Sequence, residues 1–229
     1  MSLAGRLLQL CTSPHAAMAA VRSASAVQVI GTWAVLLAVW AGAAWLLLSG
    51  PVGRQALVDE RVRVVEAIGG TVTDASYAAL QANPPYWIYL SSGGRALLFP
   101  AVTLAVAAGL YLWLGRRGAG WLASLSVAVH ASAALVAQQV VATPVHFVRE
   151  SLTSPFNLAA LLPFFDEGSL PARFFGTVEL FGLWWVWLLA IGCAVLAGRP
   201  ARNFVLPLLG IYVGVAGVIA ALVVLTGGS

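Results

Sequence analysis

The sequence predicts an all-α polytopic membrane protein, a helical bundle with five transmembrane helices plus interfacial amphipathic helices. Two observations carry this prediction. The composition is 61% hydrophobic and 9% charged, whereas a soluble domain has about a quarter charged residues to face water. The apolar residues also gather into runs of about 20, the length of a helix that crosses a bilayer. An ordinary soluble enzyme is therefore excluded, and no nucleic-acid partner is expected.

We expect a single integral membrane domain that covers residues 1–229 and contains five membrane spans. They are residues 27–48, 96–114, 121–142, 178–197 and 204–225. Continuous apolar runs indicate helices, because the strands of an outer-membrane barrel alternate polar and apolar residues. Residues 1–26 are expected to form a cytoplasmic N-terminal helix, and residues 49–95 and 143–177 to form outer loops.

Arginine placement sets the expected orientation. Six Arg and no acid occupy the N-terminal segment and the short second and fourth connections, namely Arg6, Arg22, Arg116, Arg117, Arg199 and Arg202. The other six Arg and all eight acids belong to the opposite side. Short loops with an excess of Arg face the cytoplasm. The N-terminus is therefore expected inside and the C-terminus outside.

The segments between the spans carry their own helix signals. Ser13 before Pro14 predicts a cap for a short helix that lies on the membrane surface. In the first outer loop, an apolar arc from Leu57 to Ile68 predicts an amphipathic helix, and Asp74 predicts the cap of a second one. Both are expected on the membrane surface or against a partner.

Two further features of the outer loops are expected from spacing and composition. Asp59 and Arg63 stand four residues apart, as helical ion pairs do. The loop 143–177 is rich in Pro and Phe, so we expect a re-entrant or interfacial segment.

Catalytic motifs are absent from the sequence. It has no H-E-x-x-H, G-x-S-x-G, Walker A or dinucleotide-binding pattern. His15, His130 and His146 lack metal-ligand spacing. We therefore expect no catalytic residue, no metal, no cofactor and no enzymatic activity.

Polar residues within the spans are the candidate functional residues, because polar side chains are costly in hydrocarbon. They are His130, Gln138, Gln139 and Glu179. His130 is expected either to relay protons or bind a substrate, or to hold the bundle together by an interhelical hydrogen bond. Glu179 is expected as an anchor at headgroup level or beside Arg149 or Arg173, with coupling-ion binding as the alternative.

A glycine pattern marks the last span. Gly210 and Gly214 form a G-x-x-x-G pair, and Gly217 follows. Such pairs let two helix backbones approach closely. The face they form packs either within the monomer or against another copy or a partner, and the sequence leaves both open.

Several short motifs resemble the bacterial branch of the Yip (Ypt-interacting-protein) domain family. The opening Gly5-Arg6-Leu7-Leu8 with Ser13-Pro14-His15 is similar to the family's cytoplasmic segment. His130-Ala131, the stretch 154–158 (S-P-F-N-L), the stretch 179–184 (E-L-F-G-L-W) and Gly192 resemble its later motifs. Glu179 stands where Asp is commoner in the family, and the first outer loop is long.

The resemblance implies five spans and a non-enzymatic membrane protein that is an accessory or scaffolding partner of another membrane protein, such as an ABC-type exporter. Expected partners are thus the lipid bilayer and exporter components or further copies of the chain. The absence of Lys is typical of a GC-rich bacterium, so the inner membrane is the expected location. The alternative function is a small-solute or proton-coupled permease that uses the polar residues of the third and fourth spans.

Overall fold

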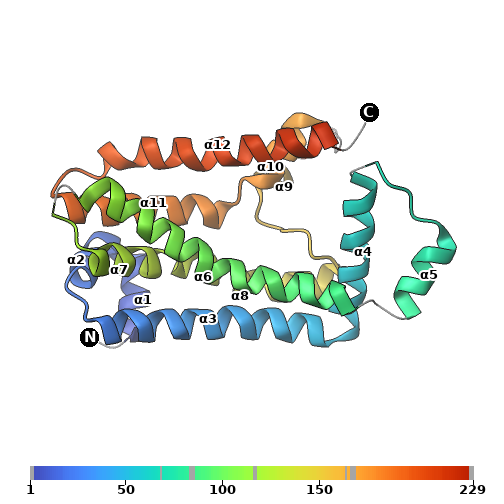
Figure 1. The fold of residues 1–229 in the computed structure, drawn as a ribbon, viewed down its shortest axis with the longest axis horizontal. Helices are drawn as coiled ribbons and strands as arrows, with labels where there is room; N and C mark the ends of the chain where they lie inside the picture. The colour runs from blue at the N-terminus through green and yellow to red at the C-terminus, as the bar shows by residue number, and fades with distance from the viewer. Residues whose placement is uncertain are drawn as a thin grey trace. The chain divides into compact units, whose positions relative to one another are not determined.

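The computed structural model describes residues 3–67, 69–82, 86–115, 118–162, 164–165 and 169–226. Within these ranges the fold is all-α, and the extended backbone pairs only at one isolated bridge, between Asn157 and Glu179. Figure 1 shows the helices in order from blue to red. They are α1 (Leu3–Thr12), α2 (Pro14–Val21), α3 (Ala26–Ser49), α4 (Pro51–Ala67), α5 (Asp74–Ala82), α6 (Tyr86–Leu114), α7 (Trp121–Ala131), α8 (Ala133–Arg149), α9 (Leu158–Leu161), α10 (Leu170–Thr177), α11 (Leu180–Ala197) and α12 (Arg202–Thr226).

The described residues include five helical stretches that are long and apolar enough to cross a membrane, which confirms the multi-pass helical bundle. They are Ala26–Ser49, Leu97–Leu114, Trp121–Arg149, Leu180–Ala197 and Arg202–Leu222. The chain folds as two compact units. The first comprises Met1–Trp40, Leu98–Gln138 and Phe181–Tyr212, and the second comprises Ala41–Leu97, Gln139–Leu180 and Val213–Ser229.

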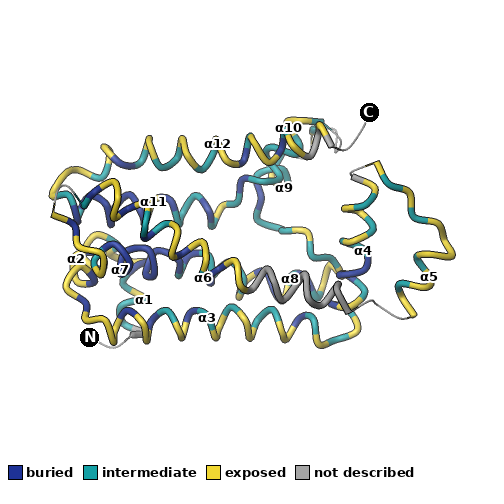
Figure 2. Tube along the Cα trace, viewed as in Figure 1, coloured by how far each residue is buried: buried dark blue, intermediate teal, exposed yellow. Residues whose placement is uncertain are grey.

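Helix α7 forms the centre of the first unit. Every residue from Ser124 to Ala131 is buried, and Figure 2 shows α7 as a dark blue segment. The polar side chains of Ser124, Ser126 and His130 are therefore surrounded by protein rather than by lipid. One side of α7 packs with α1, α2, α6 and α11, and another packs with α3 and α6.

The closest approach in this unit is between α7 and α11. A Cβ added at Gly192 of α11 would lie 2.2 Å from Cγ1 of Val127. Gly182, also on α11, leaves room for the hydroxyl of Tyr212 in the same way. These glycines let large side chains fit against the α11 backbone.

The N-terminal helices are docked into the first unit. Leu10 of α1 and Met18 of α2 are buried in its core. The Ser126 hydroxyl of α7 donates a 2.7 Å hydrogen bond to the Val21 carbonyl, which lies at the end of α2. Such terminal carbonyls have no partner within their own helix. Helix α2 therefore packs against protein on its apolar side, where the sequence had predicted only a membrane surface, and α1 is an additional helix.

Two predicted helix caps are wrong in detail. Ser13 makes no side-chain hydrogen bond at the start of α2. Asp74 is the first residue of α5, and its neighbour Thr73 accepts a 3.3 Å hydrogen bond from the Ser76 amide instead. Thr73 is a capping residue type as well, so local sequence did not distinguish the two positions.

The third span is longer than predicted. Helix α8 continues through Pro144 and ends at Arg149, whereas the expected span ends at residue 142. Proline removes one backbone donor, but helices within membranes tolerate it because nearby groups satisfy the freed carbonyl. The loop to the next span therefore begins seven residues later, at Glu150.

A sharp turn connects α3 with α4 in the second unit. A Cβ at Gly53 would lie 2.0 Å from the Leu47 carbonyl oxygen, so only glycine fits. Helix α4 buries Ala56, Leu57 and Val58 but exposes Val64. The predicted apolar arc is therefore buried only in its first part, and Ile68 lies outside the described residues.

Helices α4 and α5 are joined by hydrogen bonds between side chains. The Asp59 carboxylate accepts one from the Tyr77 hydroxyl and one of 2.8 Å from Gln55. The hydrogen bond to Asp59 raises the pKa of Tyr77 above its ordinary value. Arg63 donates to the Thr153 hydroxyl, so the predicted pairing of Asp59 with Arg63 is wrong.

The contact between α7 and α11 leads to a stability prediction. We expect Gly192→Ala to lower the free energy of unfolding by about 1–3 kcal/mol, the usual effect of overpacking, because Val127 is β-branched and cannot rotate away. The double variant with Val127→Ala should recover most of the loss. Thermal unfolding in detergent measures both.

Gly210→Ala is the matched control, because nothing lies within 4 Å of a Cβ at Gly210. Equal melting temperatures for Gly192→Ala and Gly210→Ala would contradict the close contact.

Candidate functional site

His130 lies at the C-terminal end of α7 and is fully buried. Its Nδ1 lies 2.8 Å from the Ser126 carbonyl oxygen. A carbonyl only accepts, so Nδ1 carries the proton and donates. In the neutral ring, Nε2 is then an acceptor, and it has no hydrogen-bond partner among the described residues. The bond to Ser126 lies within one helix, so it is not the interhelical bond that the sequence suggested.

Four other buried polar atoms lack a hydrogen-bond partner in the described part of the chain, and all belong to the first unit. They are Nε of Arg6, Oε1 of Gln9, Nε1 of Trp33 and Oγ of Ser124. Buried polar atoms are nearly always paired, with water if not with protein. The sequence had identified only His130. The amphipathic pattern of α1 was the signal that would have found Arg6 and Gln9.

The two glutamines of α8 are half-buried. Gln138 belongs to the first unit and Gln139 to the second. The Gln139 carbonyl accepts a 2.7 Å hydrogen bond from the Thr143 hydroxyl, one turn later.

Glu179 precedes α11, so the prediction that it stands inside the fourth span is wrong. It pairs with Asn157 in the isolated bridge. The Leu158 amide donates to the Val178 carbonyl and the Leu180 amide to the Phe156 carbonyl, each at 2.9 Å. The Ser154 hydroxyl donates to Oε2 of Glu179 at 2.8 Å.

This bridge joins the two segments that the sequence singled out separately, 154–158 and 179–184. Asn157 and Glu179 pair in extended form just before α11 begins, and the flanking backbone hydrogen bonds fix their register. Through its hydrogen bond with Ser154, the Glu179 carboxylate connects the loop to the start of α11.

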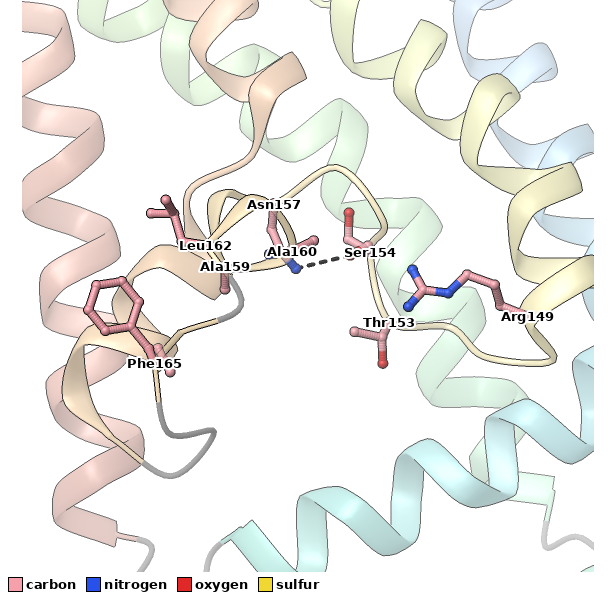
Figure 3. Close-up of a pocket in the computed structure, with 9 residues that line it drawn as sticks. Arg149, Thr153, Ser154, Asn157, Ala159, Ala160, Leu162 and Phe165 are labelled. Carbon is pink, nitrogen blue, oxygen red and sulfur yellow. Dashed lines mark hydrogen bonds between the residues drawn. The ribbon is translucent and has the colours of Figure 1, made fainter.

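A pocket of about 410 Å³ lies in the same loop. Figure 3 shows the Arg149 guanidinium pointing across it toward Thr153 and Ser154, with Leu162 and Phe165 at the opposite end. Asn157 forms part of the pocket wall. Its side-chain amide is hydrogen-bonded within the loop: Nδ2 donates to the Ser154 carbonyl at 3.0 Å, and Oδ1 accepts from the Ala160 amide at 2.8 Å. No sequence pattern predicted this pocket, because it depends on how the loop folds back.

Aromatic rings pack around the apolar end. Phe165 is stacked on Phe175 with ring centroids 5.4 Å apart and is 4.6 Å from Phe164. Phe174 packs edge-on against Phe175 at 5.2 Å. The high phenylalanine content of this loop thus supplies a local apolar cluster.

The predicted glycine face divides into two parts. Nothing lies within 4 Å of a Cβ at Gly210 or Gly214, whereas one at Gly217 would meet the Phe174 ring at 4.0 Å. Gly210 and Gly214 are exposed and lie one turn apart on α12. Neither glycine is covered by described residues of its own compact unit.

Metal-binding residues do not gather in the described ranges: no three His, Cys, Asp or Glu side chains lie together. The two cysteines are unpaired thiols, Cys11 exposed and Cys193 buried.

Comparison with known proteins gave no match: no family model, no curated protein and no solved structure is similar to the chain. The resemblance to Yip-domain proteins therefore still depends on the short motifs alone.

Proposed function

We propose that the chain is a non-enzymatic, Yip-like protein of the bacterial inner membrane that binds and stabilises or regulates another membrane protein, as an accessory or scaffold. The supporting observation is the uncovered pair Gly210 and Gly214. An ABC-type exporter is the class of partner that the resemblance implies.

The contrast among the glycines supports this proposal. Gly182 and Gly192 are occupied by contacts inside the first unit, whereas Gly210 and Gly214 meet nothing within 4 Å. Gly31, Gly42 and Gly109 are open as well, but each stands alone. Only Gly210 and Gly214 are four residues apart, the spacing that lets a second helix approach along one face.

The partner is tested by affinity purification in mild detergent followed by mass spectrometry. We expect a membrane protein to co-purify with the wild type and to be reduced about tenfold when Gly210 and Gly214 are both replaced by Leu, because the side chains separate the two helices. Gly109→Leu, an open glycine on α6, should leave recovery unchanged.

Two results would contradict the proposal. One is a wild-type chain that purifies without a companion in several mild detergents. The other is an equal effect of the Gly109 and Gly210/Gly214 variants.

The proposed orientation has the N-terminus in the cytoplasm and the C-terminus outside, because short loops rich in Arg remain inside. Cys11 is exposed and Cys193 buried, so one native thiol reports on the N-terminal side. A membrane-impermeant maleimide should label inverted vesicles at least about tenfold more than intact spheroplasts. Cys11→Ser should abolish the signal, and stronger labelling of spheroplasts than of inverted vesicles would reverse the orientation.

A second candidate function is a small-solute or proton-coupled permease, and the unpartnered Nε2 of His130 is the observation in its favour. Intramembrane imidazoles occur in proton relays. Under this function, liposomes with a trapped pH dye should show proton flux that His130→Ala reduces at least about tenfold. His15→Ala, at an exposed position, should retain it. Wild-type liposomes as tight as empty ones would rule this function out.

A further inference from the structure

The pocket in the second unit has no part in the proposed function, yet its walls have a distinct chemistry at each end. We propose that it binds the anionic headgroup of a phospholipid, with the phosphate at Arg149 and Thr153 and the first part of an acyl chain between Leu162 and Phe165. Its volume of about 410 Å³ falls within the usual range of small-ligand sites, about 300–1,000 Å³.

The position of the pocket along the chain places it at a membrane surface. Arg149 is the last residue of one candidate span, and Leu180 is the first residue of the next. The lining residues, from Arg149 to Ala172, therefore lie in the connection between two consecutive spans. Phospholipid headgroups are the anions that such a connection meets at highest density.

Arg149 supplies the charge. Within the described part of the chain its guanidinium has no ion pair or hydrogen bond, and it points into the pocket (Figure 3). A guanidinium binds phosphate oxygens through two parallel N–H donors. A second guanidinium, that of Arg63 on α4, donates a hydrogen bond to the Thr153 hydroxyl oxygen.

Thr153 supplies a directed donor. Its hydroxyl oxygen accepts from Arg63 and, at 3.2 Å, from the Ser151 hydroxyl, so its own proton remains available. The Ser154 hydroxyl already donates its hydrogen bond to Glu179, a residue that does not line the pocket. The polar end thus offers donors from Arg149 and Thr153, an arrangement that selects an anion.

The frame that holds Arg149 is fixed by local hydrogen bonds. Glu150 takes the left-handed conformation, with φ of 49°, and the Ser151 amide donates to the His146 carbonyl at 3.3 Å. Nδ1 of His146 donates back to the Ser151 carbonyl at 2.7 Å. This is the Schellman type of helix end, and it pre-organises the polar end, which lowers the cost of binding.

The apolar end distinguishes a lipid from free phosphate. Leu162, Phe165 and Ala172 line it, and Phe165 is backed by the ring of Phe175. An inorganic anion would leave these side chains unused, whereas the glycerol and first methylenes of a phospholipid would cover them.

The test is isothermal titration of the full-length chain in an uncharged detergent. Three probes are compared, namely dihexanoyl phosphatidylglycerol, dihexanoyl phosphatidylcholine and inorganic phosphate. We expect the phosphatidylglycerol to bind about tenfold more tightly than either of the others, the factor that one good charge-assisted contact supplies.

Three variants and one control connect this binding to the pocket. Arg149→Gln removes the unpaired cation, Thr153→Val removes the donor at nearly constant shape, and Ala160→Trp fills the cavity from its exposed edge without changing charge. Each should weaken phosphatidylglycerol binding about tenfold. Arg202→Gln, at the start of α12, should leave it unchanged.

Equal affinity for the two lipids, or equal loss in the Arg149 and Arg202 variants, would overturn the proposal. Phosphate binding as tight as phosphatidylglycerol binding would overturn the assignment to lipid. Because the Arg149 guanidinium has no ion pair or hydrogen bond with the described residues, a melting temperature equal to that of the wild type accompanies the expected result.

Discussion

In a hydrocarbon solvent every backbone N–H and C=O group must find its partner within the protein, and most features of this structure follow from that constraint. The spanning segments meet it as helices, even through Pro144 and Pro207. Irregular backbone occurs between spans, and there the extended segments around Asn157 and Glu179 donate their amides to each other. The pocket of the second unit is built in this irregular stretch, whereas other polar contacts in that unit join α4 and α5.

A second consequence concerns side chains. Glycine on α11 is used to bring Val127 and Tyr212 against the helix backbone, since helices in lipid gain stability from close van der Waals contact rather than from hydrophobic burial. The same residue type on α12 meets nothing within 4 Å at Gly210 and Gly214. One residue type therefore marks both a contact made inside the first unit and a face left for another molecule or for lipid.

The sequence predicted the fold class and the existence of all five spans, because uncharged apolar runs of about 20 residues are characteristic of helices that cross a bilayer. The predicted helix boundaries are wrong where the fold overrides a local sequence preference. The third span was expected to end at residue 142, although α8 continues through Pro144 to Arg149, and Glu179 was counted in a helix that begins one residue later. Asp74 and Thr73 are both favourable helix-capping residues. Which of them caps α5 depends on the backbone geometry, and the residue types alone do not determine that geometry.

The candidate sites were less accessible to sequence reasoning. The burial of His130 was foreseeable from the apolar residues around it, whereas its unpartnered Nε2 depends on which neighbours reach it. The pocket was not foreseeable, because its lining residues from Arg149 to Ala172 surround one cavity only through the folded path of the loop, in which Asn157 pairs with Glu179. Contacts between residues that are far apart in the chain leave no pattern in a short stretch of sequence.

The docking of the N-terminal helices has a consequence for biosynthesis. Arg22 donates to the Val195 carbonyl at 3.5 Å across 173 residues, and Ser126 reaches Val21 across 105. At ribosomal rates of about 5–20 residues per second, the chain up to Val195 takes roughly 9–35 s longer to appear than Arg22 does. A segment that is made early is thus among the last to reach its final position, and until then its apolar side needs a temporary shelter, such as the lipid surface or an insertion factor.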